Sequence, residues 1–199
     1  MDKRIGIFGG SFDPVHTGHV SLGKSFLESG LIHHLLILLT PDPPHKQSEI
    51  RAGYEDRLAM LKIAFREFEN VEISTLEQQL PTPSYTLQTI EYLQDLYPEN
   101  LFYLCIGEDS LVNFHQWHRY LEILKRLDLI VAERPGYDSQ NVSEEIMESV
   151  IMVDHHPVEA SSTEIRQHVK KNGGTLLDNA HIPPAVHRYI DEKGLYRGG

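Results

Sequence analysis

Six short apolar runs alternate with stretches of helical periodicity, and this alternation constrains the fold of the chain more than any other feature. The runs predict strands at Arg4–Phe8, Leu35–Leu39, Val71–Ser74, Leu101–Ile106, Leu127–Ala132 and Val150–Val153. Helices are expected between them at about 20–28, 53–67, 85–96, 119–126 and 142–148. Because strands joined by single helices pair in parallel through right-handed crossovers, the sequence predicts an α/β fold with a parallel sheet.

The pattern changes after Val153, where only two helices are expected, at about 162–171 and 184–193. The length of 199 residues suits one domain, 1–199, whose helical C-terminal part spans about 160–199. In open parallel sheets, ligands bind beyond the carboxyl ends of the strands, where the strand order reverses. The polar motifs of this chain fall at or just after predicted strand ends, so we expect them to face that edge of the sheet.

Composition and charge exclude several classes of partner. The formal net charge of −11 argues against a basic nucleic-acid-binding face, so any anion must be held by a local cluster of cations and N–H groups.

No apolar run approaches the length of a membrane span, and the N-terminus leads directly into a strand without room for a signal peptide. The only cysteine, Cys105, is expected to be buried, which fits a cytoplasmic protein. The sequence does not determine the oligomeric state, and a homo-oligomer is compatible with it.

The segment from Gly9 to His19, GGSFDPVHTGH, joins the first predicted strand to the first predicted helix. Glycines at a strand–helix corner let the backbone approach a phosphate, and the corner supplies N–H groups as donors. His16 and His19 are three residues apart, so both rings can face one site around the first helical turn. A plain turn at Gly9-Gly10 and a capping role for the histidines are the structural alternatives.

Other candidate residues follow the second, third and fourth predicted strands. Lys46, in Pro43-Pro44-His45-Lys46, suits a phosphate, or is simply a solvated loop residue. Ser84-Tyr85-Thr86 either caps a helix or presents N–H groups to a carboxylate. Asp109, after Gly107, either accepts ribose hydroxyls or is an N-cap, and Glu108 either points to solvent or weakens the binding of an anion.

Three further groups lie later in the chain. Trp117, beside His118, is either a core residue or the wall of a partly open pocket. Arg134, after the fifth predicted strand, suits a phosphate if it is not an ordinary surface residue. Ser161-Ser162-Thr163 with Arg166 either caps a helix or binds a triphosphate at the helix N-terminus.

Taken together, these segments resemble the HxGH nucleotidyltransferases, and among them the bacterial nicotinate-nucleotide adenylyltransferases. The resemblance covers His16 and His19 and the segments PPHK, SYT, G-x-D, RPG, SSTxIR and the closing Gly194-Leu195-Tyr196. It implies a Rossmann-like fold and an enzyme of NAD biosynthesis that joins ATP and nicotinate mononucleotide, giving nicotinate adenine dinucleotide (deamido-NAD) and pyrophosphate. Mg²⁺ would come with ATP, without a metal site built from protein side chains.

The resemblance also assigns roles to the candidate residues. Catalysis would use His16, His19, Lys46 and Arg166. ATP would be bound by Gly9, Gly10, Ser11, Phe12, Asp13, Gly107, Asp109, Ser161, Ser162 and Thr163. Nicotinate mononucleotide would be bound by Ser84, Tyr85, Thr86, Trp117, His118 and Arg134.

Three alternatives to this function stay open. One alternative is adenylyl transfer to another acceptor, such as phosphopantetheine, FMN or nicotinamide mononucleotide. It would use the same Gly9–His19 motif with a different acceptor pocket. A nucleotide-binding sensor without turnover is suggested by departures from the family pattern at Leu39, Glu108 and His118. Asp154-His155-His156 is similar to a phosphoesterase metal triplet, although partner clusters are not evident.

Overall fold

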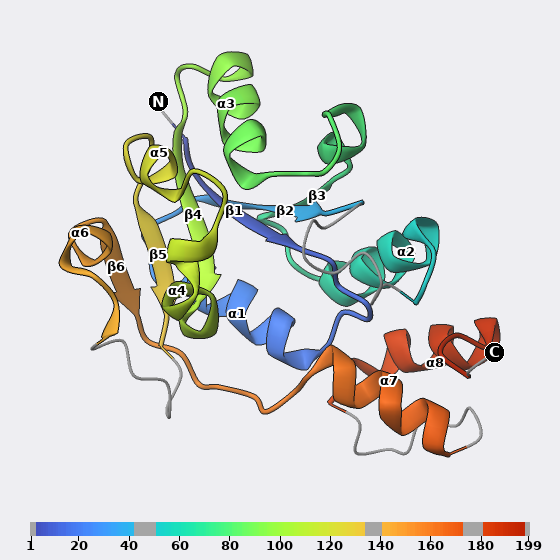
Figure 1. Cartoon of the computed structure of the whole chain (residues 1–199). Helices are drawn as coiled ribbons and strands as arrows, with labels where there is room; N and C mark the ends of the chain where they lie inside the picture. Colours follow the sequence, from blue (N-terminus) through green and yellow to red (C-terminus); the bar gives the residue numbers. More distant parts are fainter. Residues whose placement is uncertain (1–2, 42–50, 134–140, 173–180, 198–199) are drawn as a thin grey trace.

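A computed structural model of the chain describes residues 3–41, 51–133, 141–172 and 181–197, and its centre is a six-stranded parallel sheet (Figure 1). The strands lie in the order β3-β2-β1-β4-β5-β6. Their bounds are β1 Arg4–Gly10, β2 His34–Leu39, β3 Val71–Ser74, β4 Leu101–Gly107, β5 Leu129–Ala132 and β6 Val150–Val153. This order is the Rossmann order, and it reverses between β1 and β4, which is where such sheets bind ligands.

All six predicted strands are confirmed, with differences at their ends. β1 and β4 extend through Gly9-Gly10 and Gly107, because a glycine can continue a strand without adding to an apolar run. β5 begins at Leu129 rather than Leu127, because the Leu127 N–H still donates to the Ile123 carbonyl in the preceding helical turn, at 3.2 Å. The apolar pattern therefore located each strand but not its polar or glycine-rich limits.

The helices agree with the predicted ones, both those that connect strands and the two that follow β6. They are α1 Thr17–Glu28, α2 Tyr54–Phe65, α3 Thr86–Leu96, α5 Tyr120–Leu124, α6 Glu144–Met147, α7 Ser162–Lys171 and α8 Pro184–Lys193. The short helix α4 Glu108–Val112 and the 3₁₀ turns Leu76–Gln79 and Phe114–Gln116 were not predicted. α4 directly follows the apolar run of β4, and the two 3₁₀ turns are too short to show a helical period.

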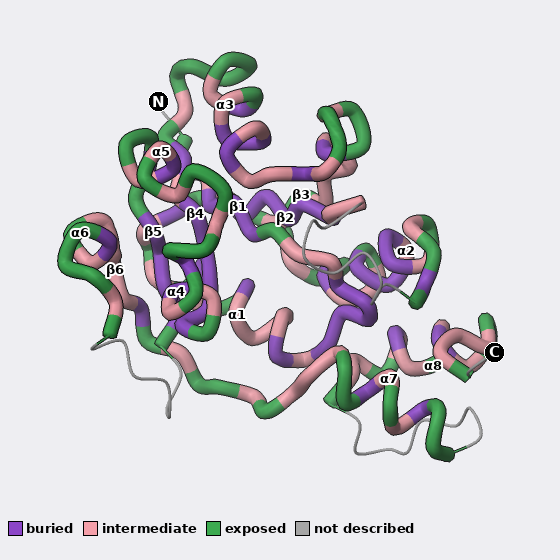
Figure 2. The backbone as a smooth tube through the Cα atoms, in the orientation of Figure 1, coloured by how far each residue is buried: buried purple, intermediate pink, exposed green. Residues whose placement is uncertain are grey.

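Two apolar cores cover the two faces of the sheet. In Figure 2 the buried residues (purple) lie along the strands of the sheet and along part of the surrounding helices. One core joins the sheet to α1, α2, α7 and α8, for example through Phe26, Phe65, Ile165 and Val186. The other joins it to α3, α4, α5 and α6, for example through Ile90. The C-terminal helices therefore share the first core with α1, and α8 packs directly against α2.

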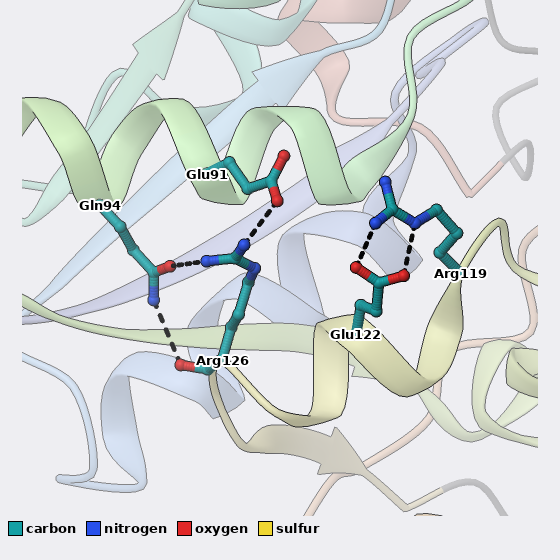
Figure 3. Close-up of polar contacts among 5 residues, drawn as sticks. All are labelled: Glu91, Gln94, Arg119, Glu122 and Arg126. Carbon is teal, nitrogen blue, oxygen red and sulfur yellow. Dashed lines mark hydrogen bonds and ion pairs between the residues drawn. The ribbon is translucent and has the colours of Figure 1, made fainter.

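On the second face, polar contacts join the short helix α5 to α3 (Figure 3). Arg126 Nη2 lies 2.6 Å from Glu91 Oε1, and the Gln94 side-chain amide donates to the Arg126 carbonyl at 3.2 Å. Arg119, at the start of α5, pairs with Glu122 one turn later. These pairs are exposed and individually contribute about 0–1 kcal/mol. The Arg126 contacts attach the turn that follows α5 to α3.

Within the described residues, no helix is long and apolar enough to cross a membrane.

Candidate active site

A cavity of about 500 Å³ opens at the carboxyl ends of β1 and β4, where the strand order reverses. Its walls come from the β1–α1 loop, the first turn of α1, the β4–α4 junction, Trp117, and the segment that leads into α7. Of the residues expected to bind ATP or to act in catalysis, the cavity brings together Gly9, Gly10, Ser11, Phe12, Asp13, His16, His19, Gly107, Asp109, Ser161, Ser162, Thr163 and Arg166. Residues 150 positions apart in the sequence thus share one site.

Gly9 lines this cavity with its main chain. It is the only exposed residue of β1, although β1 is a central strand. A Cβ atom added at Gly9 would meet no described atom within 4 Å, whereas one added at Gly10 would lie 2.9 Å from the Phe12 ring. Phe12 has a φ of 45°, an uncommon value for a residue with a side chain, and its ring is buried. The loop therefore turns sharply over a buried ring and leaves Gly9 open to a ligand.

The two motif histidines lie side by side at the start of α1. His16 is the N-cap residue and His19 is in the first turn; their rings stack with centroids 3.7 Å apart. The His16 main-chain N–H donates to His19 Nδ1 at 3.2 Å. In a neutral imidazole, an accepting Nδ1 leaves the proton on Nε2, so His19 is held as an Nε2–H donor at the cavity wall.

The segment into α7 is bonded directly to the β1–α1 loop. Arg166 Nη1 donates to the Asp13 carbonyl at 2.8 Å, and the Ser162 hydroxyl donates to the Pro14 carbonyl at 2.9 Å. Ser161 is the N-cap residue of α7, but its side chain makes no capping hydrogen bond. Ser161 therefore holds the N-cap position without a capping hydrogen bond among the described residues. The N-termini of α1 and α7 both line this cavity.

Asp13 is buried, and its carboxylate is used within the protein. Oδ2 accepts the Arg51 N–H at 2.8 Å, and Oδ1 accepts the Ala52 N–H at 3.1 Å. The Tyr196 hydroxyl also donates to Oδ1, at 2.7 Å, and burial with the adjacent carboxylate raises the pKa of Tyr196 well above its ordinary value. These bonds indicate that the Asp13 side chain holds the loop in shape. A direct contact of Asp13 with ATP stays a prediction.

At the β4–α4 junction, Gly107 is the N-cap residue and Asp109 lies in the first turn. The N-cap alternative for Asp109 is therefore wrong, and Asp109 is exposed at the cavity wall. A Cβ atom at Gly107 would lie 2.6 Å from Asp109 Oδ1, so a larger residue there would displace the Asp109 carboxylate. Glu108 is buried, contrary to the expectation that it could point to solvent. Its side chain lines the cavity instead.

Of the described residues expected to bind nicotinate mononucleotide, only Trp117 is among those that line the cavity. Trp117 is half-buried: it packs against the second apolar core and also lines the cavity, so the two interpretations of Trp117 each hold in part. The His118 ring stacks on Tyr85 with centroids 4.2 Å apart. Tyr85, rather than Ser84, is the N-cap residue of α3, so the Ser84 capping alternative is also wrong. Ser84 Oγ is buried and has no hydrogen-bond partner among the described residues.

Lys46 and Arg134 lie outside the described residues. The cavity also includes residues that sequence reasoning did not select, among them Gly18, Leu22, His155 and Val158. His155 was noted only in the triplet Asp154-His155-His156; its Nδ1 lies 3.0 Å from Ser25 Oγ of α1. Among the residues that the structure describes, no group of three or more His, Cys, Asp or Glu side chains is placed to hold a metal ion.

Cys105 lines the bottom of the cavity but is completely buried, as expected. Burial raises the pKa of its thiol far above the ordinary value, because the thiolate would be desolvated. The side chain is therefore an uncharged part of the core and not a nucleophile.

Comparison with known proteins defines the class of this fold and site. A family model described as Cytidylyltransferase-like matches residues 7–168, which include both the β1–α1 loop and the N-terminus of α7. A probable nicotinate-nucleotide adenylyltransferase from Endomicrobium trichonymphae is 35% identical over 194 residues, covering 98% of this chain and 99% of the relative. One from Geobacillus thermodenitrificans is 37% identical over 193 residues, covering 97% and 86%.

Solved structures show the same fold. Plasmodium falciparum nicotinic acid mononucleotide adenylyltransferase in complex with APC superposes with a TM-score of 0.77 at 20% identity, covering 98% of this chain and 97% of that chain. The same Plasmodium enzyme in complex with NaAD gives a TM-score of 0.76 at 22% identity. The chain belongs to the nicotinate-nucleotide adenylyltransferases, within the cytidylyltransferase-like family.

Proposed function

We propose that this protein transfers the adenylyl group of ATP to nicotinate mononucleotide, forming deamido-NAD and releasing pyrophosphate. The observation that supports this most strongly is the convergence of the α1 and α7 N-termini, His16, His19 and Arg166 on one cavity at the β1–β4 edge. Two helix N-termini and a guanidinium favour a polyphosphate, and the full-length relatives are named for this reaction.

The reaction itself needs no general base. The acceptor phosphate has a second pKa near 6, so at neutral pH its oxygen is mostly ionised and attacks the α-phosphorus directly. A bond forms between that oxygen and the α-phosphorus, and the bond from the α-phosphorus to the bridging oxygen of pyrophosphate breaks. Catalysis then consists of aligning the two anions and stabilising the charge that develops on the leaving group.

The described residues can supply this stabilisation. His19, whose Nδ1 accepts the His16 N–H, offers Nε2–H to a phosphate oxygen. Arg166 is fixed by the Asp13 carbonyl and so presents its remaining donors from a defined position. We expect Mg²⁺ to enter as the ATP complex, with triphosphate oxygens and water as its main ligands. Lys46 is proposed as an additional phosphate contact.

The acceptor pocket is proposed at the N-terminus of α3. The first-turn N–H groups of a helix have no intrahelical acceptors, so those of Thr86 and the next residue suit the nicotinate carboxylate. The Tyr85–His118 stack fixes this helix end beside Trp117, which supplies an aromatic surface for the pyridine ring. Arg134 is proposed to hold the acceptor phosphate. A cytoplasmic location is proposed because the only cysteine is unpaired and buried.

The test is pyrophosphate release from ATP and Mg²⁺ with nicotinate mononucleotide, nicotinamide mononucleotide or phosphopantetheine as separate acceptors. We expect nicotinate mononucleotide to exceed the nicotinamide form by at least about tenfold in kcat/KM, since the amide loses a charge-assisted contact of about 1.5–3 kcal/mol. Equal use of both forms would refute the pocket. Bound ATP without pyrophosphate release for any acceptor would favour a sensor instead.

A further inference from the structure

Arg57 is a buried cation behind the β1–α1 loop, and the reaction as proposed does not use it. It lies in the first turns of α2 and is 1% exposed. No carboxylate forms an ion pair with its guanidinium in the part of the chain that the structure describes. It also lies near the positive end of the helix dipole. Burial lowers the pKa of Arg57, and the nearby Asp13 charge opposes this shift. A buried cation stabilises a fold only through its partners, so the partners of Arg57 indicate what it does.

The guanidinium binds three main-chain carbonyls from two separate loops. Nη1 donates to the Ser11 carbonyl at 2.8 Å and to the Thr40 carbonyl at 2.9 Å, and Nη2 donates to the Pro41 carbonyl at 3.3 Å. Ser11 belongs to the cavity wall, and Thr40 and Pro41 follow the end of β2. The Tyr54 ring lies beneath the guanidinium, 5.5 Å from its carbon to the ring centroid. The planar fork of an arginine suits this arrangement, and a lysine ammonium does not reproduce it.

The Ser11 contact decides which side of the loop faces a ligand. In a trans peptide the C=O and N–H groups point in opposite directions, so turning the Ser11 carbonyl toward Arg57 turns the Phe12 N–H away from it. The neighbouring carbonyls are held as well: the Gly10 carbonyl accepts the Thr40 N–H at 3.0 Å, and the Asp13 carbonyl accepts from Arg166. The loop therefore has its carbonyls engaged by donors, which favours an anion at its N–H groups.

We propose that Arg57 is a positioning residue for the triphosphate, which fixes the Ser11 peptide and the Thr40–Pro41 backbone in the arrangement that binds ATP. This inference rests on the proposed function, because it assumes that the β1–α1 loop binds the phosphates of ATP. Arg57 touches no reactant: it acts through main-chain carbonyls. Replacing Arg57 is therefore expected to raise the KM for ATP, and not the KM for the acceptor, which is proposed to bind at the N-terminus of α3.

The test compares Arg57→Met and Arg57→Lys with Arg66→Met, which removes an exposed arginine at the end of the same helix. We expect Arg57→Met to raise the KM for ATP about 10- to 100-fold, with the KM for nicotinate mononucleotide changed less than about threefold. Arg57→Lys should recover only part of the ATP affinity, because the charge is restored without the fork. Arg66→Met should leave both KM values unchanged.

Binding of Mg²⁺ with inorganic tripolyphosphate, followed by calorimetry on the folded variants, separates this inference from the proposed reaction. Weaker tripolyphosphate binding in Arg57→Lys supports the positioning role even if the wild-type protein uses another acceptor. An unchanged KM for ATP and unchanged tripolyphosphate binding in folded Arg57→Lys would overturn it. If Arg57→Met does not fold, the comparison of Arg57→Lys with wild type decides whether the positioning role holds. An equal rise in the KM values for ATP and for nicotinate mononucleotide would also overturn the positioning role.

Discussion

Replacing Gly9 with alanine tests whether the open face of β1 is where the reactants lie. The new Cβ would meet no described atom within 4 Å, and Gly9 has an ordinary strand conformation. The fold should therefore tolerate the change within about 0.5 kcal/mol. A ligand packed against the glycine would have to move by roughly 1 Å, and a misplacement of that size costs about 10²-fold in rate. We therefore expect kcat/KM for ATP to fall about 100-fold, equivalent to about 2.7 kcal/mol.

The matched control is Gly6→Ala in the same strand. There the new Cβ would lie 2.7 Å from both Cys105 Sγ and Ile32 Cδ1, inside the core. Overpacking of about 1–3 kcal/mol should lower the Tm by about 2–12 °C, while the remaining folded enzyme keeps its KM values. Thermal unfolding and steady-state kinetics on both variants separate the two effects. A Gly9→Ala enzyme with normal Tm and kcat/KM within threefold of wild type would refute the placement of ATP on this face.

Two further predictions concern single side chains. His19→Ala should lose about 10²–10³ in kcat, the scale of one transition-state donor, whereas the exposed control His115→Ala should stay within about twofold; a loss below threefold for His19→Ala would exclude the proposed role. Burial raises the pKa of Glu77, partly offset by the Thr89 hydroxyl that donates to it at 3.0 Å. Because the folded state holds this proton more tightly than the unfolded state, the stability that Glu77 contributes is complete at acidic pH and is lost as the pH rises through its folded pKa. Glu77→Gln should therefore gain in Tm relative to wild type between pH 5 and pH 8, whereas the exposed control Glu69→Gln should not; a gain independent of pH would contradict this assignment.

Much of the sheet could be predicted because each buried strand is a continuous apolar run. Ile7 and Leu36 pair in the centre of the sheet, and both belong to runs that the sequence shows directly. The extension of β1 through Gly9 and Gly10 could not be predicted this way, because glycine carries no hydropathy signal. It depends on pairing with β2 as far as Leu39.

The candidate site could be predicted where a local motif carries it, and not where distant residues define it. His16 and His19 are close in sequence, so their shared site followed from helical spacing. Asp13 is different, because its carboxylate accepts a hydrogen bond from Tyr196, 183 residues away. The local motif could not show whether this carboxylate contacts ATP or holds the loop in shape. Arg57 gave no sequence signal because its partners are main-chain carbonyls of three other positions.

The central claim is that the phosphate of nicotinate mononucleotide attacks the α-phosphorus of ATP in this cavity. The most direct test uses nicotinate mononucleotide labelled with ¹⁸O in its phosphate and follows both products by mass spectrometry. The account predicts deamido-NAD and pyrophosphate in equal amounts, with all of the label in the dinucleotide. Label in the released pyrophosphate, or ATP turnover without the dinucleotide, would contradict it.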